Sequence, residues 1–113
     1  MKTSLTARHF SIDDKVRNYA IESMVGLKKY FGRIVGVQMV LLKEKERWGA
    51  ELIIGVPGET LTAVSNDDIL FTAIDDAVSK AERQLKKYKS KVKHEKDRRE
   101  AKQRGSVPGR RRY

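Results

Sequence analysis

The sequence predicts an α+β two-layer sandwich, in which two helices pack on one face of a four-stranded β-sheet in the order β-α-β-β-β-α. Two segments repeat apolar residues in steps of three and four, which places those residues on one face of a helix. Four shorter segments are rich in apolar or β-branched residues and are separated by turn residues, as strands are. Because each helical segment has a single apolar stripe, both helices can cover the same side of one sheet. With 113 residues, the chain is large enough for one such domain.

The first two elements are a short strand and a helix. Residues 3–10 are predicted to form the strand, because Thr and Phe favour an extended chain. Asp13 is the expected N-cap of the helix, since its carboxylate can accept a hydrogen bond from a free backbone N–H group. Gly32 is expected to end the helix in the left-handed conformation. The apolar face of this helix consists of Val16, Ala20, Met24, Leu27 and Phe31.

Three further strands are expected to form a meander. Residues 35–42 are largely apolar, residues 48–56 alternate less regularly, and residues 59–65 complete the sheet. The charged residues 43–47 make the first polar connection. Pro57-Gly58 is a tight-turn signal for the second connection.

A long second helix is predicted after the helix-capping residues Asn66-Asp67-Asp68. Its apolar stripe consists of Leu70, Ile74, Val78, Ala81, Leu85, Tyr88 and Val92. The stripe stops there, because Lys96 and Arg99 occupy the positions that would continue it. The sequence therefore predicts a folded domain at residues 1–95 and a basic, disordered tail at residues 96–113.

The excess positive charge lies in the last third of the chain. From Lys80 to Tyr113 there are 15 Lys and Arg residues against four Asp and Glu residues, whereas residues 1–79 hold 10 basic and 11 acidic residues. A near-neutral body with a basic arm is typical of proteins that bind a polyanion, and nucleic acid is the expected one.

The basic part of the second helix is the strongest functional signal. A run of charges on a helix is usually only its solvated face, but acidic residues would then be interspersed. Between Arg83 and Lys93 there are none, which favours binding of nucleic-acid phosphates. Lys28 and Lys29, near the end of the first helix, are explained equally well by the helix dipole or by an extension of the basic surface beside the second helix.

Composition argues against catalysis and metal binding. The chain has no cysteine, and His9 and His94 are too far apart in sequence to form a ligand motif. There is no Ser/His/Asp set, P-loop or dinucleotide motif, so neither an enzyme activity nor a cofactor is expected. No apolar run approaches the roughly 20 residues that cross a bilayer, and the N-terminal residues do not resemble a signal peptide. A cytoplasmic location is therefore expected.

Several segments together resemble the family of ribosome hibernation-promoting factors and ribosome-associated inhibitor A. The matching segments are Arg17-Asn-Tyr19, Leu27-Lys-Lys-Tyr-Phe31, Ala63-Val-Ser65, Phe71-Thr-Ala-Ile-Asp75 and Glu82-Arg-Gln-Leu-Lys86. The resemblance covers residues 2–95, and it implies the same β-α-β-β-β-α order that the apolar patterns predict.

The resemblance also implies a function, which is inhibition of translation in stress or stationary phase. Members of the family bind 16S rRNA in the decoding channel of the small ribosomal subunit, between head and body, and block binding of mRNA and tRNA. The rRNA-binding positions that the resemblance implies are Lys80, Arg83, Lys86, Lys87, Lys89, Lys91 and Lys93, together with Lys28 and Lys29.

The chain is expected to be a short form of the family, without the second domain that dimerises ribosomes in long forms. Inhibitor-type short forms carry a tail that becomes acidic, whereas this tail ends with Arg110-Arg-Arg112. Two outcomes therefore stay open, which are inactive single ribosomes and ribosome dimers formed together with ribosome modulation factor.

Two other functions also fit the residues. A general double-stranded RNA-binding module would also place two helices against one face of a sheet, and it would bind short free duplexes as tightly as ribosomes. Alternatively, the basic tail would bind an acidic protein or a membrane surface, although its few bulky apolar residues argue against membrane insertion. Deletion of residues 96–113 tests this last function, which predicts complete loss of binding.

Overall fold

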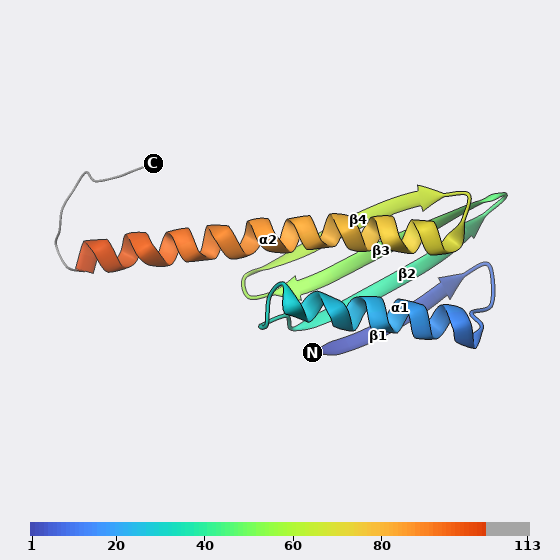
Figure 1. The fold of residues 1–113 in the computed structure, drawn as a ribbon, viewed down its shortest axis with the longest axis horizontal. Helices are drawn as coiled ribbons and strands as arrows, with labels where there is room; N and C mark the ends of the chain where they lie inside the picture. Colours follow the sequence, from blue (N-terminus) through green and yellow to red (C-terminus); the bar gives the residue numbers. More distant parts are fainter. Residues whose placement is uncertain (104–113) are drawn as a thin grey trace.

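The computed structural model describes residues 1–103, and their side chains as far as His94. The observed order of strands and helices is the one predicted from the sequence, with an added 3-10 turn (Figure 1). The elements are β1 (Lys2–Arg8), α1 (Asp14–Gly26), the 3-10 helix η1 (Leu27–Lys29), β2 (Gly36–Glu44), β3 (Arg47–Val56), β4 (Glu59–Asp67) and α2 (Leu70–Gln103). The predicted α+β class is thus confirmed.

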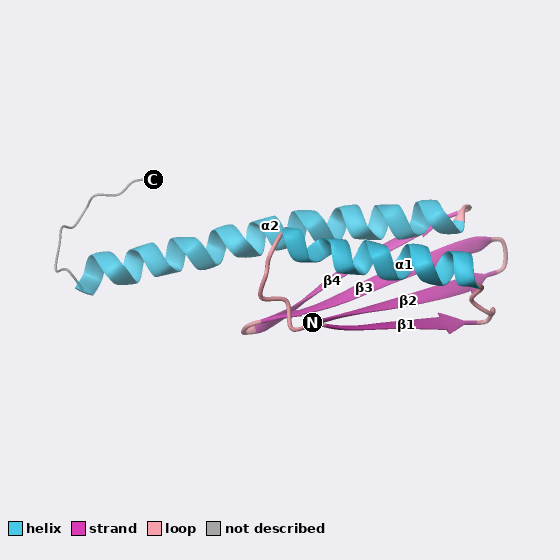
Figure 2. Cartoon of the chain, turned by 60° about the horizontal axis from the view of Figure 1, so that its bottom comes forward, coloured by secondary structure: helices cyan, strands magenta, loops and turns pink. Residues whose placement is uncertain are grey.

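The sheet has the strand order β1-β2-β3-β4, with β1 parallel to β2 and the other neighbours antiparallel. One row of residues crosses it from Leu5 through Met39 and Leu52 to Ala63. The last three are buried and Leu5 is half-buried, because this face of the sheet is the one that the helices cover. Both helices lie on the same side (Figure 2), so the core is a single layer between helices and sheet.

Small residues allow α2 to approach the sheet closely. Ala73, Ala77 and Ala81 are completely buried, and the first two lie outside the predicted stripe. Val78 and Val92 belong to that stripe but are only half-buried. The buried face of α2 is therefore rotated toward the alanines, which a count of large apolar residues does not reveal.

Helix α1 begins as predicted but ends differently. Asp13 Oδ1 accepts a hydrogen bond from the Val16 N–H over 2.9 Å, which is the expected N-cap interaction. The prediction that Gly32 is a left-handed C-cap is wrong, since Gly32 does not have a positive φ. Instead, α1 ends at Gly26 and the backbone tightens into η1, with the Leu27 N–H bonded to the preceding turn. The last carbonyl groups of α1 thus accept hydrogen bonds within a right-handed 3-10 turn, so no left-handed residue is needed to end the helix.

Two short turns connect the antiparallel strands. The connection predicted at residues 43–47 is reduced to Lys45-Glu46, because the residues on either side continue the pairing of β2 with β3. Lys45 has a φ of +52°, and Gly58 of the predicted Pro57-Gly58 turn has a φ of +85°. In the first loop the positive φ lies at the first position, as a turn that follows the twist of the strands requires. In the second loop it lies after Pro57, where a type II turn requires glycine.

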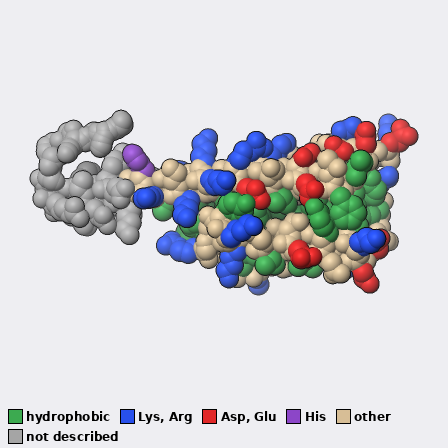
Figure 3. Space-filling view, in the orientation of Figure 1, with side chains coloured by type: hydrophobic (Ala, Val, Ile, Leu, Met, Phe, Trp, Pro, Cys, Tyr) green, Lys and Arg blue, Asp and Glu red, His purple; other side chains and the backbone are tan. Residues whose placement is uncertain are grey.

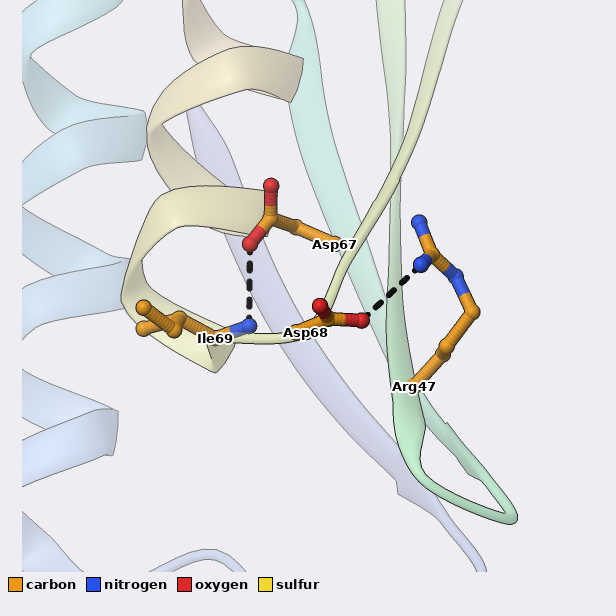
Figure 4. Close-up of polar contacts among 4 residues, drawn as sticks. All are labelled: Arg47, Asp67, Asp68 and Ile69. Carbon is orange, nitrogen blue, oxygen red and sulfur yellow. Dashed lines mark hydrogen bonds and ion pairs between the residues drawn. The ribbon is translucent and has the colours of Figure 1, made fainter.

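A polar cluster joins β4 to the start of α2 (Figure 4). Asp67 Oδ1 accepts a hydrogen bond from the Ile69 N–H over 2.9 Å, and this bond turns the chain out of the strand and into the helix. Arg47 of β3 lies 2.9 Å from the carboxylate of Asp68. Both members of this ion pair are exposed, so it contributes no more than about 1 kcal/mol to stability.

Helix α2 extends well beyond the sheet (Figure 1). Val92 still packs against the core, and the helix then continues to Gln103. Residues 96–103, which were predicted as the start of the tail, are therefore helical. The rest of the predicted tail lies outside the described residues, and the division at residue 95 stays a prediction.

Candidate nucleic-acid interface

The candidate interface is the basic part of α2 between Lys80 and Lys93. All seven of its Lys and Arg residues are exposed, as are Lys28 and Lys29. The sequence predicts the same role for all of these residues, but the structure gives their charged groups different surroundings.

Two side chains of α2 lie against the outer edge of β4. The Lys80 ammonium donates a hydrogen bond to the Val64 carbonyl oxygen over 2.8 Å. Gln84 Nε2 donates to the Thr62 carbonyl oxygen over 2.7 Å. We call Lys80 and Gln84 the edge pair, because they bond to backbone acceptors of an edge strand that would otherwise be open to another strand.

The opposite side of α2 meets the end of the first helical segment. Tyr30 directly follows η1, and its ring lies near two ammonium groups. Lys29 Nζ is 5.7 Å from the ring centroid, and Lys86 Nζ of α2 is 5.3 Å from it. We call these three residues the Tyr30 cluster. The end of the first helix thus lies beside the second, which is the condition for Lys28 and Lys29 to extend the basic surface.

The next residue along the chain fixes this arrangement. Phe31 packs edge-on against Tyr88 of α2, with ring centroids 5.2 Å apart. Tyr88 is buried, and its hydroxyl donates a hydrogen bond to the Pro57 carbonyl oxygen. Leu27 of η1 is completely buried in the core. Tyr88 is therefore part of the core, as predicted, and not a platform for stacking a base.

The remaining basic side chains of α2 extend into solvent. Within the described residues, Arg83, Lys87, Lys89 and Lys93 make no hydrogen bond or ion pair, and we call them the free cations. Lys91 differs, because its ammonium lies 3.5 Å from Glu59 Oε2. Four charges of the predicted interface are thus available to an external anion without breaking an interaction with the described residues.

On the face drawn in Figure 3, charge is distributed unevenly over the described residues. Lys and Arg side chains gather over the half where α2 leaves the sheet, and most Asp and Glu side chains lie over the end where α2 begins. Such a distribution orients a polyanion toward the basic half and away from the acidic end.

At the acidic end, a polar contact joins the two helices near their starts. The Tyr19 hydroxyl donates a hydrogen bond to Asp75 Oδ1, and Tyr19 packs edge-on against Phe71 with centroids 5.0 Å apart. The hydrogen bond to Asp75, followed by burial and the carboxylate charge, raises the pKa of Tyr19 above 10.0. Asp75 is therefore engaged in the packing of the two helices.

In the part of the chain that the structure describes, the other aromatic and titratable groups do not form a second site. The Trp48 ring packs edge-on against Phe10 at 4.8 Å and lies under Lys43 Nζ at 4.2 Å, so protein side chains already occupy its surroundings. Among the residues described, no group of three or more His, Cys, Asp and Glu could hold a metal ion. Neither helix, as far as the structure describes it, is long and apolar enough to cross a membrane.

Sequence reasoning missed Tyr30 and Gln84 as members of this region. Tyr30 lies in one of the segments that resemble the family, yet its position beside Lys86 depends on the packing of elements that are far apart in sequence. Gln84 is uncharged, so a search for basic residues passes over it. Like Tyr30, Gln84 lies in one of the segments that resemble the family. Its spacing from Lys80 is a second signal, since residues four apart lie on one side of a helix.

The architecture defines the class of protein: a β-α-β-β-β-α sandwich whose long second helix presents a row of exposed cations. Residues 3–93 match the family model described as "Sigma 54 modulation protein / S30EA ribosomal protein". The chain belongs to this family, which confirms the family indicated by the sequence resemblance.

Individual relatives agree with this assignment. The chain is 30% identical over 93 residues to the ribosome hibernation promoting factor of Escherichia coli, covering 82% of this chain and 98% of the relative. It is 29% identical over 91 residues to the protein of the same name from Pseudomonas putida, covering 80% of this chain and 89% of the relative.

Two solved structures have the same fold. The N-terminal domain of Thermus thermophilus Protein Y superposes with a TM-score of 0.72 at 28% identity, covering 78% of this chain and 99% of that domain. A ribosomal subunit interface protein from Coxiella burnetii gives a TM-score of 0.75 at 21% identity, covering 80% and 99% of the two chains. The second likeness concerns the fold alone.

Proposed function

We propose that this protein is a ribosome hibernation factor that binds 16S rRNA in the decoding channel of the small ribosomal subunit and blocks mRNA and tRNA. The observation that supports the proposal most strongly is the acid-free stretch from Arg83 to Lys93, which carries the four free cations on an exposed helix. Relatives named ribosome hibernation promoting factor support the ribosome as the source of this polyanion.

The proposed mechanism is steric occlusion without a chemical step, so the protein is not an enzyme. Lys and Arg contacts to phosphates position the protein, and the folded body fills space that tRNA would occupy. Because such contacts go to the RNA backbone, recognition depends on the shape of the rRNA channel rather than on its base sequence. Release of counterions makes the affinity fall steeply as salt is raised.

The residues proposed to contact rRNA are the free cations, together with Lys28, Lys29 and Lys86. Lys80 and Lys91, which the resemblance also implies as contacts, are assigned mainly to the fold because their ammonium groups bond to Val64 and Glu59. The proposed partners are the small subunit and its 16S rRNA in the cytoplasm, with ribosome modulation factor as a third component where ribosomes dimerise.

Co-sedimentation with separated small and large ribosomal subunits at near-physiological salt tests this function. Saturable, near-stoichiometric binding to the small subunit, abolished when mRNA and tRNA already occupy it, is the expected result. Equal and unsaturated binding to both subunits would contradict the proposal and leave only non-specific attraction to RNA. Equally tight binding to short free RNA duplexes would favour the double-stranded RNA-binding module instead.

A further inference from the structure

Tyr30 connects two basic elements that are far apart in the sequence. Lys29 belongs to η1 and Lys86 belongs to α2, and their ammonium groups lie 5.7 Å and 5.3 Å from the centroid of the same ring. At such distances an ammonium group is attracted by the negative face of an aromatic ring. The ring therefore attracts one ammonium group from each of the two elements.

The position of the ring is fixed by the fold. Before Tyr30 in the sequence, Leu27 is completely buried. After Tyr30, Phe31 packs against Tyr88 of α2. Tyr30 itself is half-buried, and its backbone is helical, with φ −91° and ψ −22°. Packing of the neighbouring residues thus places the Tyr30 ring between η1 and α2. The ring in turn lies beside the Lys29 and Lys86 side chains.

The two ammonium groups are nevertheless available to a ligand. Both side chains are exposed, and within the described residues neither lysine has a carboxylate partner. A lysine side chain that is free to rotate loses much of its rotamer freedom when it binds a phosphate. A lysine that is already held beside a ring loses less, so its interaction with a phosphate is stronger.

We propose that Tyr30 is a positioning residue that holds Lys29 and Lys86 as a preformed clamp for phosphates of the RNA backbone. The inference rests on the proposed function, because it takes the RNA backbone as the ligand. It adds a residue that carries no charge and explains how two elements of the fold act as one binding unit. The proposed clamp depends on the aromatic ring and not on the tyrosine hydroxyl.

The test compares Tyr30→Leu, which removes the ring, with Tyr30→Phe, which keeps it. Binding to small ribosomal subunits is measured for each variant at several salt concentrations, with urea unfolding as a control for the fold. Tyr30→Leu is expected to weaken binding about 3- to 10-fold with an unchanged salt dependence, because every cation is still present. Tyr30→Phe is expected to bind within about twofold of the wild type.

A second pair of variants separates positioning from a general structural effect. In a protein that already carries Lys29→Ala and Lys86→Ala, the additional change Tyr30→Leu is expected to have no further effect, because the ring has no cation left to hold. A full further loss of affinity in that background, or unchanged binding of Tyr30→Leu in the otherwise wild-type protein, would overturn the clamp. Failure of the wild type to bind small subunits would instead overturn the proposed function.

Discussion

The two sides of α2 carry the same kind of residue and use it differently. On the side facing β4, Lys80 bonds to a backbone carbonyl of the edge strand, and Gln84 does the same one turn further. On the side facing η1, Lys86 lies beside the Tyr30 ring and bonds to no backbone group of residues 1–94. The first side completes the fold, whereas the second presents charge to solvent.

The comparison teaches that the partner of a lysine, and not its exposure, indicates its role. Both Lys80 and Lys86 are exposed, and both lie in the basic half of the helix. An edge strand gains protection against pairing with other chains when charged side chains cover it. We therefore propose that a cation that serves this purpose contributes less to RNA binding than one without a partner in the fold.

The largest effect on binding is expected when cations of α2 that do not bond to β4 are removed together. Replacement of Arg83, Lys86 and Lys87 by Ala should weaken binding to small subunits by about 10- to 100-fold at near-physiological salt, because the variant neutralises fewer phosphates. Co-sedimentation measures the change. The fold should be unaffected, since all three side chains are exposed.

A matched control removes the same number of charges from the acidic end of the molecule. The control variant replaces Arg8, Lys15 and Arg17 by Ala, which are also exposed. It should bind within about threefold of the wild type, because only the long-range attraction changes. An equal decrease in both variants would mean that net charge, and not the position of the cations, determines binding.

A smaller effect, and one on stability rather than binding, is expected on the side facing β4. Lys80→Met should lower the free energy of unfolding by about 0.5–1.5 kcal/mol, because the Val64 carbonyl loses its hydrogen bond. Urea unfolding measures this change, and light scattering reports any association through the exposed edge. Lys87→Met, which removes an equivalent charge that has no partner among the described side chains, should leave stability within about 0.5 kcal/mol.

The smallest effect concerns the hydrogen bond between Tyr19 and Asp75. Because this hydrogen bond raises the pKa of Tyr19 above 10.0 in the folded protein, its stabilising contribution is complete below pH 10 and is lost as pH rises through the raised pKa. Tyr19→Phe should cost less than about 1 kcal/mol at pH 8, since the hydrogen bond is exposed. The difference from wild type, measured by urea unfolding, should shrink above pH 10. A difference that stays constant from pH 8 to pH 11 would contradict this explanation.

The sequence predicts the fold because its signals are local. Apolar residues in steps of three and four identify both helices, and turn residues such as Pro57-Gly58 separate the strands. The prediction fails where two local backbone conformations can both end a helix. Gly32 is a reasonable C-cap by residue type, but a 3-10 turn at residues 27–29 satisfies the helix end earlier. Ala73 and Ala77 were missed because small residues give a weak apolar signal.

The candidate site is predictable only in part, for a related reason. The excess of cations from Arg83 to Lys93 is visible in the sequence and indicates a polyanion. The bond from Lys80 to Val64 and the meeting of Lys86 with Tyr30 depend on how distant segments pack. No spacing along one helix can distinguish these two lysines, because both occupy exposed helical positions.

The central claim is that the free cations of α2 bind rRNA and that the cations bonded to β4 do not. The salt dependence of binding to small ribosomal subunits tests this claim most directly. Two variants, each lacking two charges, are compared with the wild type. One carries Arg83→Met and Lys87→Met, and the other carries Lys80→Met and Lys91→Met. The slope of log affinity against log salt should become shallower by about 0.7–0.9 for each phosphate that the first variant no longer neutralises, and it should stay unchanged in the second variant. Equal slopes in the two variants would contradict the claim.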